Sequence, residues 1–348
     1  MKKILINGNM GYIGPVLVNH LRKKYTGIKI IGFDSAFFAG CLIDPIIFPE
    51  SIVDVQHFGD VRHFPENILE GVDTVIQLAA VSNDPMGKAF EIPTKDINNN
   101  SAVVIAKLSK KMGVKNFVFA SSCSVYGAAG KSARNENSEL NPQTAYAKSK
   151  VECELGLKKL VDDSFVVTAL RFATACGFSP RLRLDLVLND FVASGFLNKK
   201  IEILSDGSPL RPLIHVKDMA RAIDWASFRS SENGGDFLVV NAGSNKWNYQ
   251  IKELAESVKD IIGNVKISIN SNAAKDNRSY RVDFSLFNSL APDFNPIISL
   301  DDAVNDLLDG LKTIKSLDSN FRNSKFIRLK TLKYLIDNKK INSNLTWI

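Results

Sequence analysis

The chain of 348 residues is 45% hydrophobic and 23% charged, a composition typical of a soluble globular protein with one large or two coupled domains. It contains no run of 18 or more apolar residues, so the sequence predicts no membrane span. The apolar part of the N-terminus is short and is interrupted by Gly8, which is not typical of a signal peptide, and we therefore expect a cytoplasmic protein. The cysteines lack the paired spacing of a metal site, so we expect reduced thiols and no metal; they are Cys41, Cys123, Cys153 and Cys176.

The net charge of +7 is concentrated near the C-terminus. From Asn320 onward the chain has seven Lys or Arg and one acid, Asp337, which gives this segment a net charge of +6 and leaves +1 for residues 1–319. A nearly neutral body fits a small-molecule enzyme better than a nucleic-acid-binding surface. We therefore expect no nucleic-acid partner, with RNA or DNA binding by the basic tail as a minor alternative.

Strands alternate with helices along the first half of the chain. The segments with strand character are 2–7, 28–34, 73–80, 116–122 and 165–172, and those with apolar residues at helical spacing are 12–25, 97–113 and 144–161. Several of the strands are apolar on both faces, which is typical of a parallel sheet covered by helices on both sides. We therefore predict an α/β fold with a doubly wound parallel sheet, the main part of which spans residues 1–172.

The regular alternation of strands and helices ends near Phe172. Beyond it, the predicted strands are 200–204, 236–243 and 265–270, and the predicted helices are 185–196, 217–229, 249–262 and 300–314. This mixture predicts a smaller C-terminal α/β part, residues 173–315, that binds the substrate and is partly interleaved with the sheet domain.

Residues 316–348 form a basic tail that contains an amphipathic pattern. Its apolar residues recur at helical spacing, and they are Phe326, Leu329, Leu332, Leu335 and Ile336. The pattern predicts a helix that is docked on the protein with its lysines in solvent. A helix that binds a partner or a membrane surface is the alternative.

The segment "NGNMGYIG" places Gly8, Gly11 and Gly14 between the first strand and the first helix. Glycines at this point let the backbone approach a pyrophosphate, and the N-terminus of the helix offers that anion free N–H groups. Asp34 ends the second strand, where its carboxylate is placed to accept hydrogen bonds from the adenosine ribose and to repel a 2′-phosphate. The sequence therefore predicts a Rossmann-type domain that binds NAD in preference to NADP.

A second motif, "TAYAKSK", places Tyr146 and Lys150 four residues apart on a predicted helix, so both point the same way. Oxidation of a secondary alcohol needs a base for the hydroxyl proton. An ammonium about 4 Å from the phenol lowers the tyrosine pKa by up to about three units at an effective dielectric constant of about 20. The strand that precedes this helix ends in the polar residues of "SSCS", in which Ser122 is the expected hydroxyl that holds the substrate alcohol.

Together these motifs resemble the extended short-chain dehydrogenase/reductase superfamily, and within it the NAD-dependent nucleotide-sugar epimerases and dehydratases. The resemblance extends to about Lys315 and includes "LAA" at 78–80, "SSCSVYG", "LRFATACG" at 170–177 and "RPLIHVKDMARA" at 211–222. It implies a nucleotide-diphosphate sugar as substrate and NAD as cofactor. It also implies that Ser122, Tyr146 and Lys150 are catalytic.

The resemblance and the glycine loop together give a full set of expected contacts. The expected cofactor contacts are Gly8, Gly11, Tyr12, Ile13, Gly14, Asp34, Asp60, Val61, Leu78, Ala79, Ala80, Asn98, Tyr146 and Lys150. The expected substrate contacts are Ser124, Thr174, Arg181, Asn189, Arg211 and Arg278. In the family, two arginines contact the substrate diphosphate, and Arg211 and Arg278 match them. Arg181 and its neighbour Arg183 either meet a diphosphate or belong to a solvated helix start.

The residues before Tyr126 bear on the reaction that the chain catalyses. The 4,6-dehydratases of this superfamily carry an Asp-Glu pair where this chain has Cys123 and Ser124. The 3,5-epimerase and fucose-synthase relatives place a cysteine two residues before the tyrosine, whereas Cys123 is three before Tyr126. Because side chains alternate faces on an extended segment, we expect Cys123 to point away from the sugar and to fill the core.

What remains is oxidation or reduction at one carbinol carbon, most simply C4. Epimerisation, as in UDP-galactose 4-epimerase, is one possibility, and a C4 dehydrogenase or a 4-ketosugar reductase is another. The segments at 179–192 and 82–87 resemble enzymes of surface-polysaccharide sugar pathways. A non-catalytic NAD-binding protein is less favoured, because a scaffold has no need of the serine, tyrosine and lysine together. The family also commonly dimerises through the helices at 96–112 and 144–161, so we expect a homodimer.

Overall fold

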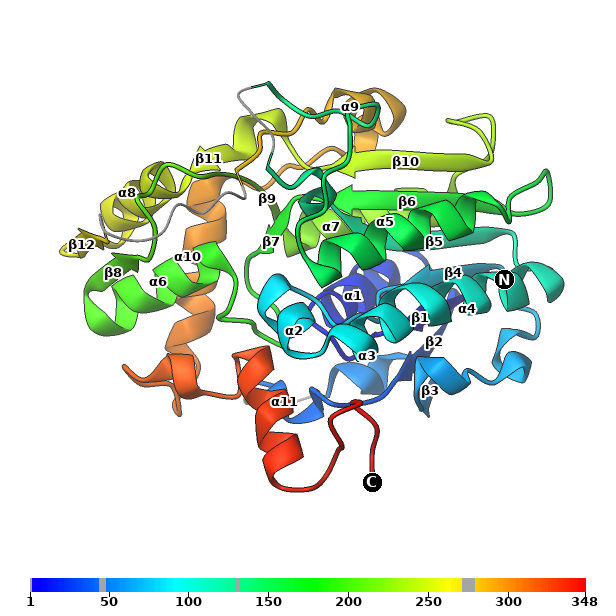
Figure 1. Ribbon diagram of the computed structural model, residues 1–348, viewed down its shortest axis with the longest axis horizontal. Helices are drawn as coiled ribbons and strands as arrows, with labels where there is room; N and C mark the ends of the chain where they lie inside the picture. Colours follow the sequence, from blue (N-terminus) through cyan, green and yellow to red (C-terminus); the bar gives the residue numbers. More distant parts are fainter. Residues whose placement is uncertain (1, 44–47, 129–131, 271–278) are drawn as a thin grey trace.

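The computed structural model describes residues 2–43, 48–128, 132–270 and 279–348. Its centre is a seven-stranded parallel sheet in the order β10-β6-β5-β4-β1-β2-β3 (Figure 1). The strands are β1 (Lys3–Asn7), β2 (Lys29–Asp34), β3 (Val55–Phe58), β4 (Thr74–Gln77), β5 (Asn116–Ser122), β6 (Val166–Phe172) and β10 (Phe237–Ala242). The chain reverses its direction of travel across the sheet after β3, so that β1 and β4 are neighbours, which confirms the predicted doubly wound α/β fold.

Helices cover both faces of this sheet because its central strands are apolar on both sides, as in β4, of which every residue is buried. The helices α1 (Gly14–Lys24) and α7 (Val216–Phe228) pack on one hydrophobic core. The helices α4 (Ala102–Lys111) and α5 (Ala145–Lys158) pack on a second core. A π-helix, Asp96–Ser101, leads into α4, so the helix predicted at 97–113 is correct in place but irregular in its first turns.

The second half of the chain contributes both to the sheet and to a smaller unit with a core of its own. Its strands are β7 (Thr174–Cys176), β8 (Lys200–Ile203), β9 (Leu210–His215), β11 (Asn248–Gln250) and β12 (Lys266–Ile269), and its helices are α6 (Val187–Asn198), α8 (Ile251–Ile262), α9 (Ser285–Leu290) and α10 (Leu300–Lys312). Strands β11, β9 and β7 form one small sheet, and β12 and β8 form another. Strand β10 instead completes the large sheet beside β6, so the two halves interleave.

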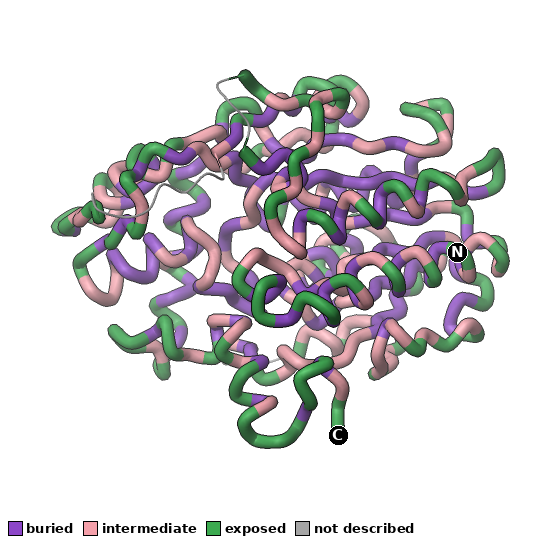
Figure 2. The backbone as a smooth tube through the Cα atoms, in the orientation of Figure 1, coloured by how far each residue is buried: buried purple, intermediate pink, exposed green. Residues whose placement is uncertain are grey.

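The C-terminal segment packs on the sheet domain through α11 (Arg328–Asp337). Leu332 and Leu335 on one face of α11 belong to the second core, together with Ile341 and Leu345 from the segment that follows. The opposite face of α11 is exposed, and Figure 2 shows this alternation at the lower edge of the molecule. This is the docked amphipathic helix that the apolar spacing predicts. Within the described ranges, no helix is both long and apolar enough to span a bilayer.

Candidate active site

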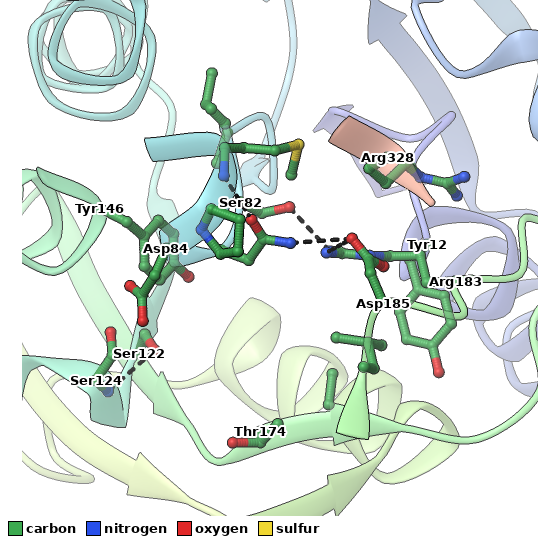
Figure 3. Close-up of a pocket in the computed structure, with 18 of the residues that line it drawn as sticks. Tyr12, Ser82, Asp84, Ser122, Ser124, Tyr146, Thr174, Arg183, Asp185 and Arg328 are labelled. Carbon is green, nitrogen blue, oxygen red and sulfur yellow. Dashed lines mark hydrogen bonds and ion pairs between the residues drawn. The ribbon is translucent and has the colours of Figure 1, made fainter. Parts of the chain in front are cut away.

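A cavity of about 1000 Å³ lies where the carboxyl ends of the central strands face the smaller unit. Ligands bind at this edge of doubly wound sheets, because the loops that follow neighbouring strands converge there. The wall includes residues of the glycine loop, the ends of β2 and β4, the first turn of α5 and the C-terminal segment. Figure 3 shows Tyr146, Ser122 and Asp84 on one side of the cavity and Tyr12, Arg183 and Arg328 on the other.

The glycine loop has the shape that a pyrophosphate requires. Gly8 has φ +83°, and a Cβ there would lie 2.5 Å from the Ala79 nitrogen. A Cβ on Gly14 would lie 2.0 Å from the Asn9 carbonyl oxygen, so Gly14 serves the packing of α1 on the loop and does not line the cavity. Gly11 lines the cavity, and a Cβ there would meet only the Gly8 carbonyl oxygen, at 3.2 Å. These residues fit a dinucleotide at the N-terminus of α1.

The remaining expected cofactor contacts lie along the same wall, with one exception. Those that line the cavity are Tyr12, Ile13, Asp34, Asp60, Val61, Leu78, Ala79 and Ala80. Asp34 accepts hydrogen bonds from the backbone N–H groups of Met10 (2.9 Å) and Ala36 (2.7 Å), which fix its carboxylate at the end of β2. Burial raises the pKa of Asp34, and these two hydrogen bonds oppose that rise.

Asn98 is the exception, because it lies behind the wall and not on it. Its Oδ1 accepts from the Val81 N–H (2.8 Å), and its Nδ2 donates to the Val81 carbonyl (3.1 Å) and to Ser149 Oγ (3.1 Å). With its amide committed to these partners, Asn98 fixes the loop after β4 against α5. The direct contact of Asn98 with the cofactor stays a prediction, and its amide contacts give it a positioning role in this structure.

The three expected catalytic side chains meet in the cavity. Tyr146 comes from the first turn of α5 and Ser122 from the end of β5, and the Ser122 side chain acts to lower the pKa of Tyr146. Lys150 lies one turn further along α5, is 3% exposed, and donates from Nζ to the Ala120 carbonyl at 2.7 Å. Its Nζ is 5.5 Å from the centre of the Tyr146 ring.

The expected lowering of the Tyr146 pKa by Lys150 is wrong for this structure. Removal of water raises the pKa of Tyr146 to about 12, and the Ser122 side chain opposes this rise. The ammonium of Lys150 is directed to the Ala120 carbonyl, and burial lowers the pKa of Lys150 itself to about 8. Helical spacing placed the two side chains on the same face correctly, but it could not show which acceptor the lysine would choose.

The shifted lysine leads to a prediction for stability. We expect Lys150→Met to stabilise the fold at pH 7 by up to about 3 kcal/mol, since a pKa lowered from 10.5 to about 8 costs about 1.4 kcal/mol per unit when the group is charged. Lys150 binds its proton more tightly in the unfolded chain than in the folded protein. The stabilisation by Lys150→Met is therefore full below pH 8 and disappears as the pH rises past 10.5. Urea unfolding as a function of pH measures it. Lys148→Met, on the exposed face of α5, is the matched control, and a less stable Lys150→Met protein at pH 7 would refute the expectation.

A buried polar network lies behind the hydroxyl-rich strand end. Arg171 donates from Nε and Nη2 to the two carboxylate oxygens of Glu154 (3.0 and 2.7 Å) and from Nη1 to the Tyr126 hydroxyl (3.0 Å). Ser121 Oγ donates to Glu154 at 2.5 Å. Cys123 is buried and directs its thiol to the Arg171 carbonyl, and burial raises the pKa of this thiol. Cys123 therefore belongs to the core, in agreement with its offset in the sequence.

The expected substrate contacts divide into three groups. Ser124, Thr174 and Arg211 line the cavity. Arg181 and Asn189 do not. Arg278 lies outside the described residues.

The two residues that miss the cavity are structural. Arg181 is 1% exposed and pairs with Glu50 at 3.0 Å. Asn189 accepts from the Gly177 N–H at 2.9 Å and donates to the Arg183 carbonyl at 2.8 Å. Buried protein partners hold the amide of Asn189 and one nitrogen of Arg181, and neither residue lines the cavity in which the substrate is expected.

Arg183 reaches the cavity in place of Arg181. It donates to both carboxylate oxygens of Asp185 (2.9 and 3.0 Å) and to Ser82 Oγ (2.9 Å) (Figure 3). Sequence reasoning missed Asp185, and it also missed Arg328 and Tyr280, which line the cavity as well. The alternation of Arg181, Leu182 and Arg183 gave no signal for this difference, since residues two apart on an extended segment share a face.

Comparisons with known proteins agree with this geometry. The model of the NAD dependent epimerase/dehydratase family matches residues 4–243. The chain is 28% identical over 236 residues to an uncharacterized UDP-glucose epimerase of Bacillus subtilis (strain 168), a match that covers 64% of this chain and 71% of that protein. It is 27% identical over 269 residues to dTDP-D-glucose 4,6-dehydratase of Dictyostelium discoideum, a match that covers 70% of this chain and 59% of that protein.

A solved structure has the same fold. It is UDP-glucose-4-epimerase from Stenotrophomonas maltophila with bound NAD and formylated UDP-arabinopyranose, with a TM-score of 0.76 and 21% identity, over 90% of this chain and 98% of that one. The family match covers more than half of the residues in the chain. This chain therefore belongs to the NAD dependent epimerase/dehydratase family and is an NAD-dependent enzyme.

Proposed function

We propose that the protein changes a nucleotide-diphosphate sugar at one carbinol carbon, most simply C4, as an epimerase. The observation that carries the proposal is that Tyr146 and Ser122 line the same cavity as the glycine loop. The names of the relatives support a nucleotide sugar as the substrate. The resemblance of segments 82–87 and 179–192 to surface-polysaccharide enzymes supports a role in making such sugars.

The side chains of the site suit the two ends of such a substrate. When bound, NAD supplies the acceptor and the donor of hydride. Ser122 holds the substrate hydroxyl, and Tyr146 accepts its proton during oxidation and returns it during reduction. Because burial raises the pKa of Tyr146 to about 12, the phenol is protonated at neutral pH and must lose its proton before it can accept the one from the substrate. Arg211 lines the cavity and is placed to pair with the diphosphate.

A 4,6-dehydratase is the second candidate, and Asp84 is the observation that favours it. Its carboxylate lines the cavity, accepts from Thr144 Oγ1 at 2.7 Å and raises the pKa of Tyr146. Elimination of water needs an acid–base group beside the tyrosine. The positions at which the 4,6-dehydratases carry their Asp-Glu pair hold Cys123 and Ser124 here, and Cys123 is buried. For this reason we favour chemistry at one carbon.

We also propose a homodimer that forms through α4 and α5. Val104 on α4 and Leu155 on α5 are 51% and 59% exposed, and a dimer would remove them from water. Light scattering of the purified protein tests this assembly.

The experiment that tests the proposed function is a panel of UDP-, GDP-, CDP- and dTDP-sugars with NAD. NMR of the products distinguishes inversion at C4, oxidation at C4 and loss of water at C5 and C6. We expect inversion at C4 for at least one nucleotide sugar, without net reduction of NAD. Loss of water would favour the dehydratase, and a product oxidised or reduced at C4 would favour a dehydrogenase or a 4-ketosugar reductase. A protein that binds NAD but converts no member of the panel would contradict the proposal.

A further inference from the structure

The C-terminal segment forms part of the cavity, which the sequence pattern of a surface helix does not predict. Five of its apolar and basic side chains line one wall, and they are Ile327, Arg328, Leu329, Leu332 and Leu345. We call these residues the C-terminal wall. The same cavity is lined by Asp34, Phe38 and Val61 from the loops after β2 and β3, which lie where the adenosine half of a dinucleotide binds in this type of fold.

The C-terminal wall is fastened to those two loops by polar contacts. Arg62 donates to the carbonyl oxygens of Asn344 (2.7 Å) and Leu345 (2.6 Å) and to Thr346 Oγ1 (3.0 Å). Trp347 donates from Nε1 to the Ser35 carbonyl at 2.6 Å. The contacts hold the end of the chain against the residues that follow Asp34 and Asp60 in the sequence. The segment is therefore a fixed boundary of this end of the cavity.

Arg328 carries a buried charge in this wall. It is 2% exposed, its Nη2 donates to the Arg181 carbonyl at 2.8 Å, and its guanidinium carbon lies 4.8 Å from the centre of the Phe38 ring. Its Nη1 is buried and has no hydrogen-bond partner among the described residues. A buried donor of a charged group without a partner is unfavourable unless an anion approaches it.

The charges that face Arg328 do not neutralise it. The nearby groups that act on it are Arg181, Arg183, Asp185 and the thiol of Cys41. The carboxylates in this region already have partners other than Arg328. Glu50 pairs with Arg181, Asp185 pairs with Arg183, and Asp34 accepts from the backbone N–H groups of Met10 and Ala36. Figure 3 shows Arg328 on the same side of the cavity as Tyr12, Arg183 and Asp185. Arg183 and Arg328 line the cavity, and Arg328 has a buried Nη1 without a hydrogen-bond partner among the described residues, which suits a phosphate.

We propose that the C-terminal wall closes the adenosine end of the NAD site and that Arg328 binds a phosphate of the ADP part of the cofactor. The inference extends the NAD dependence of the enzyme to a segment outside the family match at 4–243. The expected partner of Arg328 is the diphosphate bridge of the cofactor and not a phosphate on the ribose, because the Asp34 carboxylate on the same wall repels a phosphate on the ribose.

The proposal is tested by titration of the full-length protein with NAD, ADP and adenosine. Arg328→Gln keeps a side-chain donor but loses the charge. We expect it to weaken the binding of NAD and of ADP by about ten- to a hundredfold, the range for a lost charge-assisted hydrogen bond. Adenosine binding, measured by NMR, stays at its wild-type value. Lys333→Gln on the exposed face of α11 is the matched control, and it is expected to leave the affinities for NAD, ADP and adenosine unchanged. Arg328→Lys keeps the charge and loses less affinity than Arg328→Gln.

Two outcomes overturn the proposal. One is an Arg328→Gln protein with the NAD affinity of the control. The other is an equal loss for adenosine and ADP, which assigns Arg328 to the shape of the pocket. If Arg328→Gln does not fold, hydrogen exchange of the wild-type protein replaces the binding comparison. ADP, but not adenosine, is then expected to slow the exchange of the backbone amides in residues 328–337. If ADP does not change the exchange of these amides, the proposal is rejected. These binding measurements do not depend on turnover, so a protein that binds NAD through Arg328 but converts no sugar rejects the proposed function alone.

Discussion

Replacement of Tyr146 by Phe is expected to reduce turnover of the nucleotide sugar by about a hundred- to ten-thousandfold, the usual contribution of a positioned acid–base group. The phenol lines the cavity together with Ser122, and Phe keeps the ring but removes the only atom of this side chain that can carry the substrate proton. The affinity for NAD is expected to change little, because the glycine loop and Asp34 are unaltered. NMR of the product measures the first effect, and titration with NAD measures the second.

The chain offers a matched control for this substitution. Tyr25 has the same spacing to Lys29 as Tyr146 has to Lys150, but its hydroxyl donates to Asp224 at 2.7 Å, at residues that do not line the cavity. Tyr25→Phe removes a hydrogen bond and is expected to keep full turnover. Full turnover by Tyr146→Phe would show that another group moves the proton.

The second large effect is expected from the network behind the site, where Arg171→Met should destabilise the fold by about 3–5 kcal/mol. The substitution leaves Glu154 buried at 4% exposure without its partner. It also removes the donor to Tyr126. Urea unfolding at neutral pH, followed by circular dichroism, measures the loss. The double variant Arg171→Met with Glu154→Leu is expected to recover part of it, because no charge is then left buried without a partner.

An exposed ion pair provides the comparison for Arg171. Lys312 and Asp309 lie 2.9 Å apart on α10, and their side chains are 58% and 76% exposed. Lys312→Met is expected to leave the free energy of unfolding nearly unchanged, because water screens such pairs. If Arg171→Met behaved like Lys312→Met, the buried network would not contribute to stability. The hydroxyl-rich end of β5 would then need an explanation other than its contacts with this network.

The sheet and the glycine loop were predictable because both depend on local patterns. The strand Lys3–Asn7, for example, contains the continuous apolar run Ile4–Ile6, and the order strand, glycine loop, helix and acid is contained within residues 2–34. Tyr146 and Ser122 were assigned because a core strand ends in hydroxyl residues and because Tyr146 and Lys150 follow it within an α/β framework with a glycine loop. The four-residue spacing alone was not sufficient, since Tyr25 and Lys29 share it. The catalytic roles of Tyr146 and Ser122 stay a prediction.

Other parts of the site depend on partners that are distant in the sequence. Asn98 and Asn189 are polar and were assigned to ligands, but their amides are taken by Val81 and Gly177 in the folded chain. The role of Arg328 in the wall depends on Phe38, 290 residues earlier in the chain. No local pattern reports such pairings, and the pKa of Tyr146 likewise follows from desolvation that only the packed structure defines.

The most direct test of the proton-transfer role of Tyr146 is rapid mixing of NAD-loaded protein with a converted nucleotide sugar, followed by the absorbance of reduced nicotinamide in a single turnover. For the wild-type protein we expect a transient rise in this absorbance, and for Tyr146→Phe with the same bound NAD and sugar we expect no rise on that timescale. A rise at the wild-type rate in Tyr146→Phe would contradict the assignment of Tyr146 as the group that accepts the substrate proton.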